Sequence, residues 1–171
     1  VGTLPLVAQA VEAGDIPVIA AGGLHDGRGL AAALALGAQG VWMGTRFIAS
    51  QEAHAGAVYQ EAILAARDED TVRTRCYSGK PMRVRANPYV DEWEGRPGEI
   101  QPFPLQAMAS VQAGVLGGIG GQTEGLDPDR SCLAMGQSAG GISQVLPAGR
   151  IVADLMTQAE AAIRRSAALV G

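Results

Sequence analysis

Residues 16–29 read IPVIAAGGLHDGRG, and this stretch decides the fold. It runs from an apolar segment, residues 16–21, into a pair of glycines and only then becomes polar. A short apolar run bounded by a turn signal is typical of a strand that is buried on both faces. The polar residues that follow predict an Ala-rich helix over residues 26–37, with Asp26 as its N-cap.

The same alternation continues on both sides of this stretch. Apolar residues spaced i, i+3, i+4, i+7 predict a helix over residues 3–14 that ends at Gly14. Residues 40–44, GVWMG, predict a second short strand, and residues 50–70 predict a longer helix with Ser50 as its N-cap. Helix, strand, helix, strand, helix is the order of an α/β fold with parallel strands.

Parallel strands need neighbours, yet no further strand–helix repeat follows the second strand. We therefore expect the chain to be the C-terminal part of a larger α/β domain, with residues 1–70 forming its last βα units. Residues 71–171 are expected to form a second, α-helical and irregular subdomain. Its parts are a proline-rich connecting region, a short helix before a glycine-rich loop at residues 114–121, and closing helices.

The last of these helices is expected to start at or just after Pro147. Its amphipathic face is marked by Ile151, Leu155, Ala159, Ala162 and Ile163.

Composition narrows the classes of partner. The 171 residues are 47% hydrophobic and 18% charged, with a net charge of −4 and no clustered arginines. We therefore expect no nucleic acid partner. No apolar run approaches the roughly 20 residues that span a bilayer, so we expect no membrane partner and a cytoplasmic location. Cys76 and Cys132 lie too far apart for a CxxC motif and are expected to be reduced thiols, and no metal site is expected.

The two predicted strands end in similar ways. Gly22 and Gly23 allow a sharp turn and leave N–H groups free to face an anion, and Gly44 and Thr45 follow the second strand. In a (β/α)₈ barrel, the loops after the last two strands often hold the phosphate of a ligand. Two consecutive strand ends of this kind indicate a phosphate site, although glycines also simply terminate strands. The glycine spacing does not fit G-x-G-x-x-G, and residues 114–121 are expected to be a flexible surface loop.

Four segments, in this order, resemble the nitronate monooxygenase family, formerly called 2-nitropropane dioxygenases: residues 16–47, 50–63, 78–94 and 135–142. The resemblance implies a flavoprotein oxidoreductase that uses FMN on a TIM (β/α)₈ barrel, of which this chain would hold the last two strands. It implies a monooxygenase reaction in which an alkyl nitronate and O₂ give a carbonyl compound and nitrite. Members of the family are roughly twice as long as this chain.

The resemblance also implies site residues. Positions that match the family's flavin phosphate loops are Gly23, Trp42, Met43, Gly44 and Thr45, with Gly22 beside them. Positions that match its flavin pocket are Gln137, Ser138 and Gly140. For these three, a helix N-terminus with small residues for tight packing is an equally good explanation.

No catalytic residue is assigned. The histidine that acts on substrate in this family lies upstream of the matching segments, so the isolated chain is expected to be inactive and to bind flavin weakly or not at all. His25 is expected to be a solvated loop residue, and His54 to lie on a helix without a chemical role. Lys80, Arg83 and residues 91–93 are expected to be structural.

Two other functions remain open. One is a flavin-dependent enoyl-acyl-carrier-protein reductase, which shares the barrel, the glycine-threonine strand end and a late glycine-glutamine motif. The other is a non-catalytic flavin- or phosphate-binding module.

Overall fold

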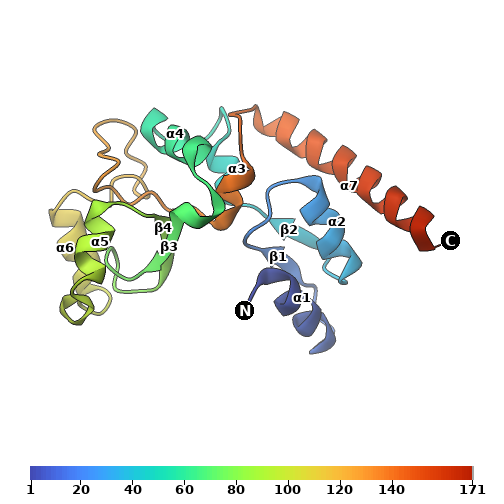
Figure 1. Ribbon diagram of the computed structural model, residues 1–171, viewed down its shortest axis with the longest axis horizontal. Coiled ribbons are helices and arrows are strands. Elements are labelled where there is room, and N and C mark those ends of the chain that lie inside the picture. The colour runs from blue at the N-terminus through green and yellow to red at the C-terminus, as the bar shows by residue number, and fades with distance from the viewer. Residues whose placement is uncertain (171) are drawn as a thin grey trace.

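The computed structural model describes residues 1–170 and has a mixed α/β architecture (Figure 1). The α-helices are α1 (Thr3–Glu12), α2 (Gly27–Ala35), α3 (Thr45–Ile48), α4 (Ala57–Ala65), α5 (Pro88–Glu94), α6 (Leu105–Gln112) and α7 (Ala148–Val170). The strands are β1 (Ile19–Ala21), β2 (Gly40–Trp42), β3 (Thr71–Thr74) and β4 (Met82–Arg85). Short 3₁₀ helices are η1 (Asp68–Asp70), η2 (Pro97–Glu99) and η3 (Gln137–Gly141).

Figure 1 shows two groups of elements with α3 and α4 between them. One group contains α1, β1, α2, β2 and α7, and the other contains β3, β4, α5 and α6. In the first group β1 and β2 pair in parallel, with Ala20 opposite Val41 and Ala21 opposite Trp42. Each of these strands is followed by a helix, so the predicted parallel α/β order is confirmed.

The prediction that residues 16–21 are buried on both faces is wrong. Ala20 is buried, but Ile16 is 79% and Ile19 is 52% exposed. The reason is that β3 and β4 form a separate antiparallel pair, and within residues 1–170 no strand flanks β1 and β2. The expectation that further strands cover this pair stays a prediction.

The first two predicted helices are present. The Asp26 carboxylate accepts a hydrogen bond from the Gly29 N–H at 3.0 Å, which confirms the predicted N-cap of α2. Helix α1 ends one residue earlier than predicted, because Ala13 rather than Gly14 is its C-cap.

The predicted helix over residues 50–70 is wrong at both ends, because α4 spans only Ala57–Ala65. The Ser50 hydroxyl donates to the Phe47 carbonyl at 2.7 Å, so this residue closes α3 instead of starting a helix. Helix α4 starts only after Gly56, whose backbone lies so close to Thr123 that a Cβ would be 2.3 Å from its carbonyl oxygen. This close approach, which involves a residue distant in sequence, sets where α4 begins.

The second half of the chain contains elements that the sequence pattern did not reveal. β3 and β4 pair antiparallel, with Thr71 opposite Arg85, and α5 follows them. The strands carry Thr, Arg and Met as well as Val, so no clear alternation of polar and apolar residues marks them. The short helix α6 and the irregular residues after it agree with the prediction.

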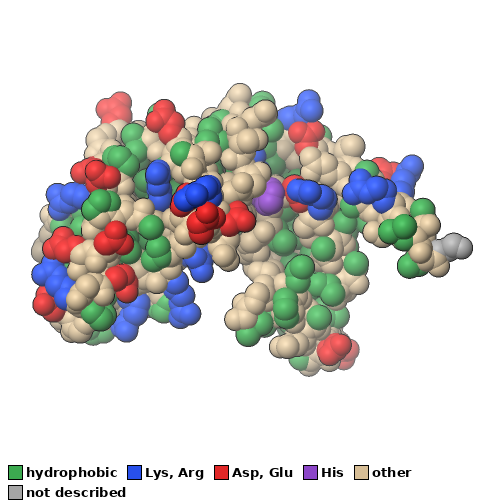
Figure 2. All heavy atoms as spheres, viewed as in Figure 1, with side chains coloured by type: hydrophobic (Ala, Val, Ile, Leu, Met, Phe, Trp, Pro, Cys, Tyr) green, Lys and Arg blue, Asp and Glu red, His purple; other side chains and the backbone are tan. Residues whose placement is uncertain are grey.

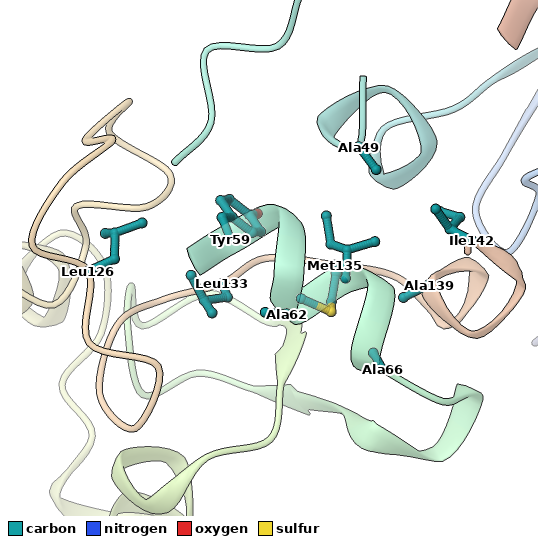
Figure 3. Close-up of a cluster of buried hydrophobic side chains, with 10 residues drawn as sticks. Ala49, Tyr59, Ala62, Ala66, Leu126, Leu133, Met135, Ala139 and Ile142 are labelled. Carbon is teal, nitrogen blue, oxygen red and sulfur yellow. The ribbon is translucent and has the colours of Figure 1, made fainter. Parts of the chain in front are cut away.

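A buried cluster lies between the two groups (Figure 3). Tyr59 and Ala62 of α4 lie next to Leu133 and Met135 from the extended segment before η3. The Tyr59 hydroxyl donates to the Ala134 carbonyl, which fixes α4 against that segment. Burial of a side chain such as Leu133 stabilises the fold by roughly 1.5–3 kcal/mol.

Helix α7 lies against α2 on the outside of the molecule. It begins directly after Pro147 and buries Ile151, Leu155 and Ala159, as predicted. Ile163 is 47% exposed, so the predicted apolar face is wrong at this position. No helix within residues 1–170 is long and apolar enough to cross a membrane.

The contact between α2 and α7 depends on a glycine. A Cβ at Gly27 would lie 2.4 Å from the Leu155 carbonyl oxygen. We predict that Gly27→Ala lowers the free energy of unfolding by about 1–3 kcal/mol, because the two helices must separate. Gly149→Ala, in the first turn of α7, is the matched control, since its Cβ would meet nothing within 4 Å. Urea unfolding of both variants should show loss only in the first; equal stabilities would contradict this packing.

Candidate cofactor-binding site

The parallel register brings the two glycine-containing strand ends together. Because Ala21 lies opposite Trp42, the chain leaves β1 at Gly22 and β2 at Met43 along the same edge. Adjacent strands are about 4.8 Å apart, so the two turns lie side by side. The structure therefore places the turn at residues 22–23 beside the turn at residues 43–45.

The first turn needs glycine for its conformation. Gly22 and Gly23 have φ angles of +104° and +70°, which other residues rarely adopt. The Thr3 hydroxyl donates to the Gly22 carbonyl at 2.9 Å and holds this turn against α1. A Cβ at Gly23 would meet no atom within 4 Å, so its backbone is open to an approaching group.

Neither the backbone conformation nor the contacts within the described residues demand a glycine at position 44. Its φ and ψ of −84° and −67° are accessible to any residue, and a Cβ there would meet nothing within 4 Å. It is the N-cap of α3, and the first N–H groups of a helix have no acceptor within the helix. Its backbone is therefore open to a group from outside the described chain.

Thr45 joins the strand end to η3. This residue is buried, and its hydroxyl oxygen accepts a hydrogen bond from the Gly136 N–H at 3.0 Å. Ser138, on η3, is also buried, and its hydroxyl lies near Gly136. The structure therefore brings the two sets of predicted site residues close together.

The remaining predicted residues differ in their surroundings. Trp42 is 73% exposed, Met43 is half-buried, and Gln137 is exposed on η3. Gly140 lies so close to Asp68 that a Cβ would be 1.9 Å from its carboxylate oxygen, so packing accounts for this glycine. A flavin-facing role for Gln137 and Ser138 stays a prediction.

A cavity of about 480 Å³ opens beside the second strand end. Met43, Gly44 and Phe47 line one side of it, and His54 and Ile119 lie on another. The glycine-rich loop that we expected on the surface therefore forms part of a cavity wall. No pattern in the sequence indicated this position, because these glycines serve close contacts with distant segments. A Cβ at Gly118, for example, would lie 2.6 Å from the carbonyl oxygen of Cys132.

Both histidines have surroundings that differ from the prediction. The His25 ring is partly buried over Gly141, where a Cβ would lie 2.0 Å from its Nε2, so it is not a solvated loop residue. His54 lies in the loop before α4 rather than on a helix, near Gly121. Within residues 1–170, no group of three or more His, Cys, Asp or Glu side chains could hold a metal ion.

The two cysteines are buried thiols without nucleophilic character at neutral pH. Burial raises the pKa of Cys76 to about 11 and that of Cys132 to about 12. Burial also raises the pKa values of Tyr59 and Tyr77 above their usual range. These groups stabilise the core in their protonated forms.

Comparison with known proteins identifies the family. The family model described as nitronate monooxygenase matches residues 1–158. The chain belongs to the nitronate monooxygenase family. A probable nitronate monooxygenase from Staphylococcus aureus (strain JH9) is 45% identical over 106 residues, which are 62% of this chain and 30% of that protein.

Two solved structures resemble this nitronate monooxygenase family chain. FabK from Thermotoga maritima is 38% identical, with a TM-score of 0.85 over 99% of this chain and 52% of that one. A nitroalkane oxidase from Streptomyces ansochromogenes is 31% identical, with a TM-score of 0.80 over 98% of this chain and 45% of that one. The chain thus spans about half the length of these structures.

The Thr45–Gly136 hydrogen bond of this family member can be tested by substitution. Thr45→Val removes the acceptor, and we predict a loss of about 1–3 kcal/mol because the partly buried Gly136 N–H is left without its partner. Thr45→Ser keeps the acceptor and should lose only about 0.8 kcal/mol for one methyl group. Urea unfolding gives the stabilities, and faster amide exchange at Gly136 in Thr45→Val alone localises the effect. Equal stability of the two variants would argue against the hydrogen bond.

Because the two thiols are buried, we predict that the folded chain loses stability in alkali. Unfolded thiols lose their protons above about pH 8.5, whereas the folded thiols keep theirs until the pH approaches their raised pKa values. The free energy of unfolding should therefore be unaffected by these groups below pH 8.5 and fall above it, by up to about 1.4 kcal/mol per pH unit for each thiol. Urea unfolding from pH 8 to 10.5 measures this, and Cys132→Ala should make the decline shallower. An unchanged slope in that variant would count against thiol titration as the cause.

Proposed function

We propose that this chain is the phosphate-holding part of an FMN-dependent enzyme that oxidises alkyl nitronates with O₂ to a carbonyl compound and nitrite. In this proposal β1 and β2 are the last two strands of a (β/α)₈ barrel, and residues 71–171 form the subdomain on its substrate side. Family membership supports the activity. The observation that carries the phosphate role is the parallel register of β1 and β2, which sets the glycine-containing turn after β1 beside Gly44 and Thr45 after β2.

The backbone would hold the phosphate of FMN. The N–H groups of Gly23, Gly44 and Thr45, which belong to the turns at one edge of the strand pair, would donate to its oxygens. The positive end of the α3 dipole adds a small favourable contribution, limited by the four-residue length of that helix. The Thr45 hydroxyl keeps η3 beside the bound cofactor, through Gly136.

The flavin, when bound, supplies the redox chemistry, and the protein orients it and limits side reactions. The cavity beside Gly44 is largely apolar, with Phe47, Ile119 and Met43 in its walls. Because this cavity adjoins Gly44, at the proposed phosphate end of FMN, the reacting ring would lie outside it. No catalytic residue of this chain is proposed.

A second candidate is a flavin-dependent enoyl-acyl-carrier-protein reductase. The observation that favours it is the similarity to FabK, which extends over 99% of this chain. A third candidate, a non-catalytic flavin-binding module, would keep the phosphate site without either activity.

An assay of the product of the chain's own gene, loaded with FMN, separates these candidates. We expect nitrite release and O₂ uptake with the nitronate of 2-nitropropane, and no oxidation of NADPH with crotonyl coenzyme A. The reverse result would establish the reductase, and FMN binding without either reaction would establish the binding module.

The phosphate site has its own test. We predict that Gly44→Val weakens FMN binding at least about tenfold, the equivalent of roughly 1.4 kcal/mol, but leaves riboflavin binding unchanged because riboflavin has no phosphate. Fluorescence titration of both flavins measures this in the same gene product. Thr157→Val, on the exposed face of α7, is the control and should bind both flavins like the parent. Equal loss for both flavins would contradict a phosphate contact at Gly44.

A further inference from the structure

A second cavity, of about 390 Å³, lies between α2, α3, η3 and α7. None of Gly23, Gly44 and Thr45 lines it, so it is separate from the strand-end site. Its walls combine apolar side chains of α7 with three arginines, Arg28, Arg46 and Arg165. Neither family membership nor the proposed function assigns a role to this cavity.

Arg46 is a buried cation without an acidic partner. It is 8% exposed, and its Nη2 donates to the carbonyls of Ala49 and Gln144, each at 2.6 Å. Its Nε is buried and has no hydrogen-bond partner among the described residues. Within residues 1–170, no carboxylate oxygen lies within 4 Å of its guanidinium nitrogens. A buried charge of this kind is costly unless an anion compensates it.

The acidic groups of the cavity are already paired. Asp26 binds Arg28 at 2.6 Å and also accepts from a backbone N–H, and these contacts hold the pKa of its carboxyl below the usual value. Asp154 binds Arg150, which lies outside the cavity, at 2.8 Å. Arg165 has no carboxylate partner in the part of the chain that the structure describes.

Two positive charges of the cavity, on Arg46 and Arg165, therefore have no carboxylate partner among the described residues, although the net charge of the chain is −4. Figure 2 shows Lys and Arg side chains along the α7 side of this face, next to the histidine that is visible there.

We propose that this cavity binds a phosphate group. Guanidinium groups suit phosphate because they can donate two parallel hydrogen bonds to its oxygens. The cavity is larger than one phosphate, and Ile151 and Leu155 line it, so the organic part of a small phosphate monoester fits beside the anion. The proposal does not depend on the function proposed above.

The chain itself is titrated by calorimetry with inorganic phosphate and, separately, with phenyl phosphate. We expect Arg165→Gln to weaken binding at least about fivefold, roughly 1 kcal/mol, because it removes one of the two unpaired cations. Arg164→Gln is the matched control: it removes the same charge one residue earlier on α7, from a side chain that pairs with Glu160 and does not line the cavity. Its affinity should stay within twofold of the parent. Both positions are exposed, and circular dichroism confirms that the variants fold.

A third variant separates this cavity from the strand-end site. Gly44→Val removes phosphate binding at the strand-end site, so the binding that remains in this variant belongs to the cavity and should be weakened by Arg165→Gln as in the parent. Tighter binding of phenyl phosphate would identify an ester as the ligand, and tighter binding of inorganic phosphate would identify the free ion. The proposal is overturned by the absence of binding at 10 mM, by equal losses in Arg165→Gln and Arg164→Gln, or by the loss of all phosphate binding in Gly44→Val.

Discussion

Parallel pairing of β1 with β2 is the constraint on which the candidate site depends. Parallel strands end on the same edge, so residues far apart in sequence deliver their backbone N–H groups to one place. Each strand is only three residues long, and the pair packs against α1 and α2. Helix α2 connects the two strands, and α7 covers α2 from outside. The position of both turns therefore depends on the close packing of α2 against α7 at Gly27.

The second structural link is between Thr45 and Gly136. One hydrogen bond connects the residue after β2 with the segment that leads into η3, and the Tyr59 contact to Ala134 lies directly beside it. These contacts fasten the irregular half of the chain to the parallel strands.

Sequence patterns predicted the elements that local signals define. The cap at Asp26, the two strands and the start of α7 after Pro147 follow from side-chain chemistry within a few residues. The break before α4 was missed because it depends on Gly56 meeting Thr123, a contact between distant segments. The hairpin of β3 and β4 was missed because its strands lack alternation.

The candidate site shows the same division. The glycines at the strand ends carry a local signal, and a positive φ at Gly23 agrees with it. The cavity wall contributed by residues 114–121 could not be predicted, because its glycines serve close contacts with segments that only the fold brings near. Arg46 likewise reads as an ordinary surface arginine until the loop containing Gln144 encloses it.

The exposure of Ile16, Ile19 and Trp42 has a consequence for how a barrel would be completed. An open pair of parallel strands presents unpaired backbone donors and acceptors beside apolar side chains, which is a template for another strand. In the proposed barrel, neighbouring strands would pair along the free edges of β1 and β2 and cover these side chains. The exposed apolar residues therefore mark the surface where the rest of the barrel would join this chain.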